Sequence, residues 1–297
     1  NGAAVQRLFD AGAILVGKAN LHELSSGGTT DNAFTGATHN PYDLSRVPGG
    51  SSGGNGAALA ARFAPFALGE DPGGSGRGPC ALSGCVGFRP TTGRYPTQGA
   101  VPLSPTLDTP TPMARSVADM ALLDSVLAGI AYEPVEPRSV RGLRIGVPRA
   151  LFYDNLDPAV VAAIDRSLEQ LTSSGAILIE ADIPLVDNNA LDSFTAVSGW
   201  ETGAAVIAYL DLSGSHITIF DIIEGIASPD VKYLWEQGLA GAGPTEAQYK
   251  QAMTYREDMR ESYQSYFADL GVEAIIYPTV PLPAPPIGQD FTIELNG

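Results

Sequence analysis

Residues 49–77 decide the fold. They consist of Gly49-Gly50-Ser51-Ser52-Gly53-Gly54, an apolar alanine-rich segment, and Gly69-Glu70-Asp71-Pro72-Gly73-Gly74-Ser75-Gly76-Arg77. The two glycine clusters each carry serine, and Ser51 and Ser75 lie 24 positions apart (75 − 51 = 24). Glycine clusters allow positive φ and let a substrate approach main-chain N–H groups. A serine at the tip of such a turn is surrounded by donors, as an acyl-transfer nucleophile and its oxyanion require. The alternative is a pair of surface loops without chemistry, which a second cluster so close to the first disfavours.

The composition indicates a globular protein that binds a small molecule. The chain has 297 residues, 44% of them hydrophobic, and no apolar run approaches a membrane span, so we expect a soluble protein with an ample core. Its 33 acidic and 17 basic residues give a net charge of −16. This charge argues against nucleic acid or an anionic membrane as partner and favours a neutral or cationic small molecule.

The cysteines and motifs point to no metal or cofactor. Cys80 and Cys85 lie five positions apart in an apolar stretch without metal-ligand spacing. We therefore expect buried reduced thiols and a cytoplasmic protein. The chain has no H-E-x-x-H motif and no Walker lysine, so zinc and nucleotide chemistry have no support.

Two helix-then-strand units indicate the fold class. Residues 2–11 have helical periodicity and precede the apolar run 13–16, and residues 157–171 precede the apolar run 176–179 in the same way. A glycine suited to end a helix separates helix from strand in each unit. The pattern predicts an α/β fold with a largely parallel or mixed sheet covered by helices.

We expect one domain over residues 1–297. Within it, 1–132 forms the core with the serine and glycine clusters, 133–138 is a proline-bearing linker, and 139–297 completes the α/β core. Residues 190–260 have helical character and carry aromatic side chains, so they are predicted to form a lid or pocket wall, with ordinary core packing as the alternative for each aromatic residue.

The sequence also predicts a capped helix, two further strands and a truncation at each chain end. Ser116 and Asp119 predict a capped helix through Leu127 that Gly129 closes. Residues 143–147 and 272–277 read as strands. The chain opens without an initiator methionine and closes without a finishing element, so we expect it to be the middle of a longer protein, truncated at both ends.

A histidine-based serine triad is open but not indicated. Residues 49–53 match the G-x-S-x-G string of an α/β-hydrolase elbow, but residues 40–48 cannot supply the hydrophobic strand that an elbow needs. Only His216 follows the first serine, since His22 and His39 precede it.

The sequence resembles the amidase signature family. The two glycine clusters, Asp71 and Gly87-Phe88-Arg89-Pro90-Thr91 carry the resemblance, which runs from Gly17-Lys18-Ala19-Asn20 through Gly129 and more loosely to the end. Residues 87–96 and 102–109 are most similar to the indoleacetamide and mandelamide hydrolase branch, which hydrolyses aryl-substituted primary amides to acids and ammonia. The glutamyl-tRNA amidotransferase A subunit is more distantly similar.

The resemblance implies the amidase signature fold, an α/β fold whose central mixed sheet is covered by helices on both faces. It also implies a Ser–cis-Ser–Lys triad. Ser75 would be the nucleophile and Ser51 the relay, joined to Ser52 by a cis peptide bond. The base would be a lysine kept neutral by burial, and its segment is expected to fall before Asn1. The lysines of this chain, Lys18, Lys232 and Lys250, are not assigned as base.

The resemblance also implies an oxyanion hole formed by the amides of Gly73 and Gly74. Pro72 departs from the family pattern because proline has no N–H to donate, which weakens the hole without abolishing it. Three further residues are expected to hold the turns in place: Ser52, Asp71 and Arg77.

The function expected from these residues is hydrolysis of a small-molecule carboxamide through an acyl-enzyme, without a cofactor and without a nucleic-acid or membrane partner. A homodimer is compatible with the sequence. Pro72 and the absent lysine keep open a non-catalytic amidase-like binding protein. An amidotransferase A-type subunit is the third hypothesis, and it would be accompanied by partner subunits.

Overall fold

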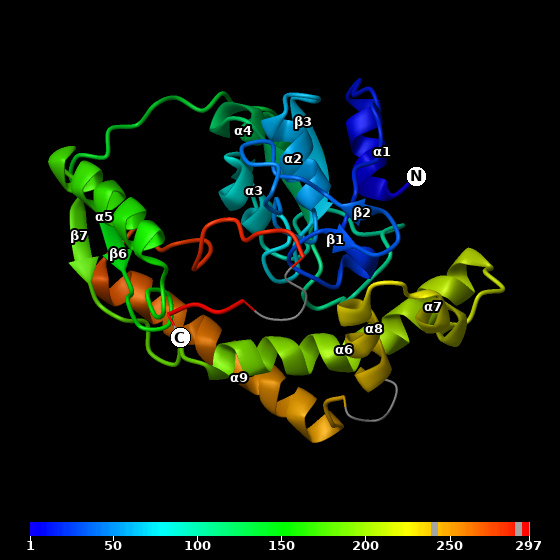
Figure 1. The fold of residues 1–297 in the computed structure, drawn as a ribbon. Helices are drawn as coiled ribbons and strands as arrows, with labels where there is room; N and C mark the ends of the chain where they lie inside the picture. Colours follow the sequence, from blue (N-terminus) through cyan, green and yellow to red (C-terminus); the bar gives the residue numbers. More distant parts are fainter. Residues whose placement is uncertain (239–242, 289–292, 297) are drawn as a thin grey trace. The chain divides into compact units, whose positions relative to one another are not determined.

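The computed structural model (Figure 1) describes residues 1–238, 243–288 and 293–296. Two compact units divide the chain. The first comprises the described residues of 1–135, 198–243 and 284–292, and the second those of 136–197, 244–283 and 293–297. The first boundary falls inside the predicted linker 133–138, which contains neither helix nor strand. A single domain over 1–297 stays a prediction.

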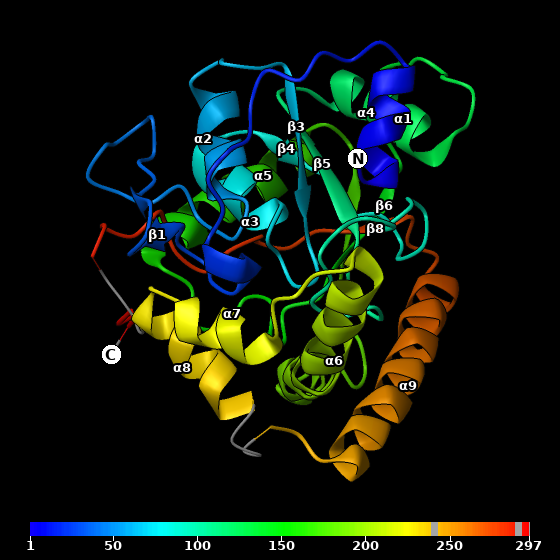
Figure 2. The ribbon, with the colours of Figure 1, turned by 90° about the vertical axis from the view of Figure 1, so that its right-hand side faces the viewer.

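An antiparallel three-stranded sheet supports the first unit. Its strands β3 (Phe66–Glu70), β5 (Pro110–Ala114) and β4 (Val86–Gly87) lie in the order β3-β5-β4. Helix α1 (Ala3–Asp10) lies beside α4 (Val117–Ala128) (Figure 2). The Ser116 side chain accepts from Asp119 N and Gly129 is left-handed after the helix, so the predicted capped helix is confirmed. Both helices and the sheet share one core cluster, formed by Ala4, Leu8, Tyr95, Ala114, Met120, Leu123 and Leu127.

The remaining short elements of this unit surround the glycine clusters. Helix α2 (Gly53–Ala60) starts within the first cluster, and α3 (Arg77–Ser83) starts where the second ends. The loop before them holds only the single-turn helix η1 (Glu23–Ser25) and the two-residue strands β1 (Asp31–Asn32) and β2 (Gly36–Ala37).

Residues 190–260 are mainly helical in the part that the structure describes, as predicted. Helix α6 (Asn189–Ser213) begins in the second unit and ends in the first. Helix α7 (Ile219–Gly225) has a capping box at Thr218, and α8 (Pro229–Gln237) starts with a proline in its first turn. None of the described helices combines the length and apolar character needed to cross a membrane.

A parallel sheet in the order β7-β6-β8 forms the second unit. Strand β6 (Arg144–Val147) pairs with β7 (Ile177–Glu180) and with β8 (Ala274–Ile275), which is shorter than the predicted strand 272–277. Helix α5 (Pro158–Ser173) begins at Asp157, whose side chain accepts from Ala159 N, and Ile164 and Leu168 face the core beside Val147. The α/β class is thereby confirmed.

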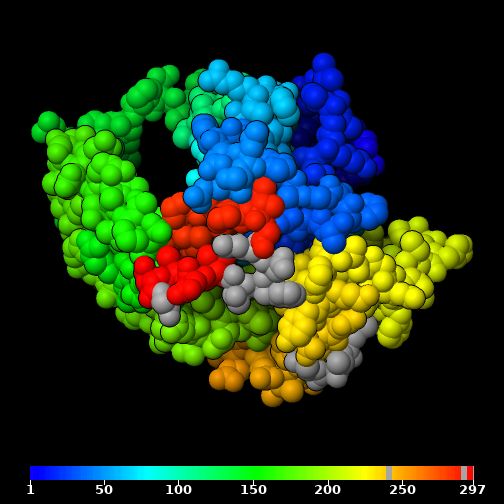
Figure 3. Space-filling model, viewed as in Figure 1, coloured from blue at the N-terminus to red at the C-terminus, as the bar shows by residue number. Residues whose placement is uncertain are grey.

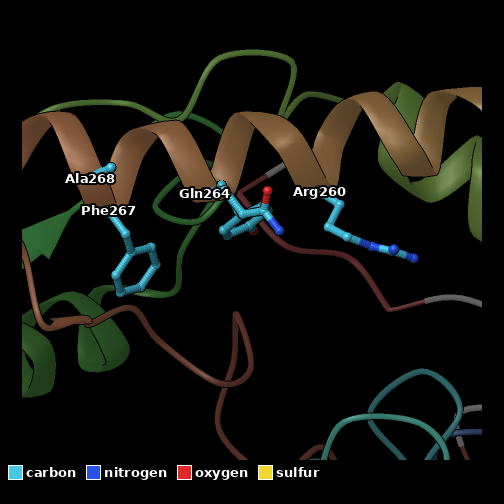
Figure 4. A pocket seen from close by; sticks show the side chains of 5 residues that line it. Arg260, Gln264, Phe267 and Ala268 are labelled. Carbon is cyan, nitrogen blue, oxygen red and sulfur yellow. The ribbon is translucent and has the colours of Figure 1, made fainter.

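Helix α9 (Glu246–Leu270) contributes Tyr266 to a second cluster in this unit. One face of α9 lines an open hollow of about 630 Å³ (Figure 4). Its lining contains none of the predicted site residues and consists of Arg260, Tyr263, Gln264, Phe267 and Ala268.

The predicted strand at residues 13–16 is wrong. Helix α1 ends as expected and Gly12 has φ +90°, but the run that follows forms no strand. Ile14 and Val16 are 86% and 75% exposed. Only Ala13 packs against the core cluster of α1 and α4. A strand needs a neighbour for its N–H and C=O groups, and among the described residues no strand pairs with this run.

The expectation of reduced thiols is also wrong, because Cys80 and Cys85 form a disulfide. Gly84 takes the left-handed conformation that ends α3 and turns the chain back. The N–H of Cys85 then donates to the carbonyl of Cys80 at 3.0 Å. The two Cα atoms lie 4.4 Å apart, within the range that a disulfide can bridge.

Candidate active site

The first serine turn contains a cis peptide bond between Gly50 and Ser51. The prediction that this bond joins Ser51 to Ser52 is therefore wrong. A cis peptide brings two Cα atoms close together, and Gly50 adds no side chain there whereas a serine pair would add two. A Cβ on Gly50 would lie 2.7 Å from the carbonyl oxygen of Gly27 and from Thr29 N, so only glycine fits.

Distant residues hold this turn. Ser51 is 1% exposed, and its carbonyl accepts from the backbone N–H of His22 at 2.8 Å. The Thr30 hydroxyl lies 2.8 Å from the carbonyl oxygen of Gly49 and 3.3 Å from that of Ser51, and it accepts from Gly53 N at 3.2 Å. The buried main-chain groups of the turn are thus paired by the His22 backbone and the Thr30 side chain of the preceding loop.

A single carboxylate holds the second serine turn. Asp71 is fully buried, and its oxygens accept from the backbone N–H groups of Gly74, Gly76 and Arg77. The Arg77 guanidinium also donates to both oxygens, from Nε at 2.9 Å and from Nη2 at 3.0 Å. Burial raises the pKa of Asp71, but Arg77 and the N–H donors outweigh it, so the net pKa is lowered. Asp71 therefore stays ionised at the base of the turn.

Main-chain contacts join the two serine turns. Ser52 N donates to the carbonyl of Ser75 at 3.1 Å. The Ser52 hydroxyl lies 3.4 Å from Glu70 N and 3.5 Å from Glu70 O, next to the second cluster. Ser75 is half-buried in the turn that leads into α3. The structure thus brings the two predicted serine segments together, with Ser51 inside and Ser75 nearer the surface.

The predicted oxyanion donors differ in their environment. Gly74 has φ +123° and donates its N–H to Asp71. Gly73 is exposed at the tip of the turn. Pro72, between Asp71 and Gly73, has no N–H. The role of Gly73 and Gly74 at an oxyanion stays a prediction, and the Asp71 bond engages the Gly74 donor in this structure.

The sequence did not predict that two acidic residues, Glu70 and Asp108, interact next to the second turn. Burial raises the pKa of Glu70 to about 8, and the charges of Asp108 and Asp71 act in the same direction. Burial also raises the pKa of Asp108, although N–H donors from Leu103 and Ser104 oppose it. Glu70 and Asp108 lie in separate segments of the chain, so they gave no common sequence signal for this interaction.

Arg89 was quoted only for the resemblance, yet it supports the same turn. Its Nε donates to the Asp71 carbonyl at 2.8 Å, and its Nη2 donates to the Leu107 carbonyl at 3.0 Å. Its place in residues 87–96, which carry part of the family resemblance, was the sequence signal that could have identified it. Together with Arg77, it places two guanidinium groups around Asp71.

The histidines and lysines provide no evident base among the described contacts. His216 is exposed, and His39 Nδ1 lies 2.6 Å from the Leu44 carbonyl. Lys250 pairs with Glu246, and Lys232 reaches toward the Glu224 carbonyl. Lys18 is exposed. No group of three or more His, Cys, Asp or Glu side chains suited to a metal ion occurs in the described residues.

Comparison with known proteins defines the class. Residues 1–295 match the Amidase family, and the chain belongs to it. It is 41% identical to an indoleacetamide hydrolase of Rhizobium radiobacter and 36% identical to a mandelamide hydrolase of Pseudomonas putida. The alignments cover 98% and 95% of this chain but 62% and 58% of those proteins, so the chain spans about three fifths of their length.

Solved structures agree with this family. A crystal structure of an amidase has a TM-score of 0.85 and 36% sequence identity, over 100% of this chain and 63% of that one. The peptide amidase of Stenotrophomonas maltophilia has a TM-score of 0.84 and 28% identity, over 98% and 66% of the two chains. The predicted amidase signature fold is thereby confirmed.

Proposed function

We propose that the protein containing this chain is an amidohydrolase that cleaves a carboxamide to an acid and ammonia through an acyl-enzyme. The observation that carries the proposal is the junction of the two serine turns, at which Ser52 N donates to the Ser75 carbonyl. Family membership and the names of the relatives support the same reaction class.

Ser75 is the nucleophile in this proposal. Its Oγ attacks the amide carbonyl carbon, and its proton passes through Ser51 toward the leaving nitrogen, which departs as ammonia. Water then adds to the acyl carbonyl, and breakdown of the second tetrahedral species frees the acid and Ser75. A neutral lysine outside this chain serves as the base.

Backbone amides stabilise the oxyanion of each tetrahedral species. Gly73 and Ser75 are the preferred donors, because the N–H of Gly74 donates to Asp71 and Pro72 has none. Removing one donor from such a site costs about 3 to 4 kcal/mol of transition-state stabilisation. Gly74 joins the donors only if its bond to Asp71 lengthens when the oxyanion forms.

An aryl-substituted primary amide is the proposed substrate. The similarity to indoleacetamide and mandelamide hydrolases supports this choice. A net charge of −16 disfavours anionic substrates. An enzyme acting alone or as a homodimer completes the proposal.

The test uses the full-length protein and measures ammonia release from an aryl acetamide. Ser75→Ala is expected to lower kcat by at least about 10³-fold, and Ser51→Ala is expected to be severely impaired too. Ser173→Ala, at an exposed serine of α5, is the matched control. Full activity of Ser75→Ala would refute the assignment.

An amidotransferase A-type subunit is the second candidate, because the chain is also 35% identical to such a subunit of Chloroflexus aggregans. That protein would co-purify with partner subunits, whereas an active lone protein excludes it. A non-catalytic binding protein is the third candidate, and saturable labelling of Ser75 by a fluorophosphonate would exclude it.

A further inference from the structure

We infer that His22 is a positioning residue for the Ser51 turn, acting through the loop 27–30 and anchored to α8 by Asp230. The kinetic test of this inference rests on the proposed function, whereas the NMR test does not. His22 is 1% exposed and belongs to none of the predicted site residues.

Hydrogen bonds fix the His22 ring in one tautomer. Its Nδ1 accepts from Thr30 N at 3.1 Å and lies 3.4 Å from Thr29 N. A nitrogen that accepts from N–H groups carries no proton, so the ring proton is on Nε2. Nε2 lies 3.0 Å from Oδ2 of Asp230 and donates to it. His22 is therefore a neutral imidazole that connects a loop to a carboxylate.

The loop that His22 supports lies directly against the Ser51 turn. A Cβ on Gly27 would lie 2.3 Å from Cε1 and Nε2 of the His22 ring, so the ring rests on the Gly27 backbone. The backbone of Gly27 to Thr29 in turn lies against Gly50, at the cis bond. Thr30, which donates its N–H to His22, also contacts the Gly49 carbonyl through its hydroxyl. Two contact routes thus lead from the ring to the Ser51 turn.

The other side of the ring is anchored to the segment that begins α8. Asp230 lies in the first turn of α8. Glu23, next to His22, accepts from Ala227 N at 3.1 Å and from Ser228 N at 2.8 Å. The space-filling view shows α8 (yellow) directly against residues of the N-terminal loop (blue) (Figure 3). Asp230 is therefore a fixed partner rather than a mobile surface acid.

Two acidic residues belong to the contacts around the ring. Asp230 faces Nε2 from α8, and Glu23, next to His22 in the chain, accepts from Ala227 N and Ser228 N. A change that removes the Nδ1 acceptor displaces the Thr30 N–H from its partner. The Thr30 hydroxyl also contacts the Gly49 carbonyl, so displacement of Thr30 would disturb the Ser51 turn. The arrangement therefore positions the turn only while Nδ1 remains an acceptor.

Three variants of the full-length protein test the kinetic role. His22→Ala removes the acceptor and the donor, and we expect kcat to fall about 10- to 100-fold with KM changed by less than about twofold. His22→Asn keeps an acceptor near the position of Nδ1 and is expected to recover part of this loss. His216→Gln, at an exposed histidine, is the control. Equal kcat in His22→Ala and the wild type would overturn the inference, as would a loss confined to KM.

Histidine ¹⁵N NMR tests the same geometry without relying on turnover. We expect the Nε2–H tautomer for His22 at about pH 7.5, and in Asp230→Asn a changed Nε2 shift with retained fold. A Nδ1–H tautomer, or a shift that Asp230→Asn leaves unchanged, would overturn the inference. An inactive wild-type protein that shows the expected tautomer would refute the proposed function and leave the ring geometry supported.

Discussion

The two serine turns are held in opposite ways. Thr30 contacts the first turn at Gly49, Ser51 and Gly53, over sequence separations of 19, 21 and 23 residues. Asp71 holds the second through N–H groups only three, five and six residues away. The second turn is therefore held mainly by residues of its own sequence, with Arg89 as a more distant support. The first turn exists only when the tertiary structure brings a distant loop to it.

Of the substitutions that test this comparison, Asp71→Asn should cause the largest loss of stability. The substitution removes the charge that faces Arg77 and Arg89 and leaves one acceptor oxygen for three N–H groups. Each hydrogen bond to a charged group contributes about 1.5 to 3 kcal/mol, and several N–H groups lose their charged acceptor here. We therefore expect a loss of about 3 to 5 kcal/mol in the free energy of unfolding, measured by urea denaturation, together with lost activity.

Asp43→Asn is the matched control for this measurement. Asp43 also accepts from a nearby N–H group and pairs with Arg46, but its side chain is 50% exposed. Its loss should cost far less than the loss of the Asp71 carboxylate, because solvent screens the exposed pair. Equal costs for the two variants would mean that burial does not distinguish the Asp71 turn.

Glu70→Gln should have the next largest effect, and this effect depends on pH. The unfolded chain ionises Glu70 near 4.5, while the pKa of the folded state is about 8. Between these values the folded protein holds a proton that the unfolded chain has lost, so stability falls as pH rises through this window. Asp71, whose pKa is lowered, acts in the opposite sense, because its contribution is lost on acidification below its ordinary value of 3.8.

The measurement is the free energy of unfolding of both proteins between pH 5 and 8. Glu70→Gln should remove a decline of roughly 3 to 4 kcal/mol, so that its advantage over the wild type grows with pH. Glu169→Gln, at an exposed glutamate of α5, is the control. Parallel curves for Glu70→Gln and the wild type would contradict a protonated Glu70 in the folded protein.

Thr30→Val tests the turn that depends on distant residues. Valine keeps the shape but removes the hydroxyl, so Gly53 N–H and the Gly49 carbonyl lose a buried partner. We expect a loss of about 1 to 3 kcal/mol in the free energy of unfolding and a decrease in kcat. Thr30→Ser retains the hydroxyl and should recover most of both, and a serine variant as impaired as the valine variant would assign the effect to the methyl group instead.

The same contrast between local and distant contacts explains which predictions from the sequence succeeded. Residues 13–16 and 177–180 both follow a helix and a glycine. The second run pairs with β6 in parallel register, whereas the first forms no strand in the described structure. Periodicity predicts an apolar extended segment, but the neighbour that makes it a strand is set by tertiary structure.

The candidate site divides in the same way. Ser51, Ser75, Asp71 and Arg77 were predicted because the glycine clusters and the family resemblance contain them. His22 was considered only as a histidine that precedes the first serine, because nothing local indicates that its ring supports the Ser51 turn. The Cys80–Cys85 disulfide was missed although Gly84, one residue before the second cysteine, is the local feature that reverses the chain.

Arg77→Lys should have the smallest effect, and it decides what holds the second turn. Lysine keeps the positive charge but lacks the planar fork that donates to both Asp71 oxygens. The Arg77 side chain is 36% exposed, so solvent screens the pair. The N–H groups of Gly74 and Gly76 still reach Asp71 in this variant.

We therefore expect Arg77→Lys to lose only about 1 kcal/mol in urea denaturation, far less than Asp71→Asn. A much smaller loss in Arg77→Lys than in Asp71→Asn would mean that short-range N–H donors hold the Asp71 turn. The guanidinium would then add to a geometry already fixed by the local sequence. If both variants lose the same free energy, the ion pair holds the turn instead. The second turn would then depend on a side-chain partner as the first depends on Thr30, and the contrast between the two turns would be one of sequence distance alone.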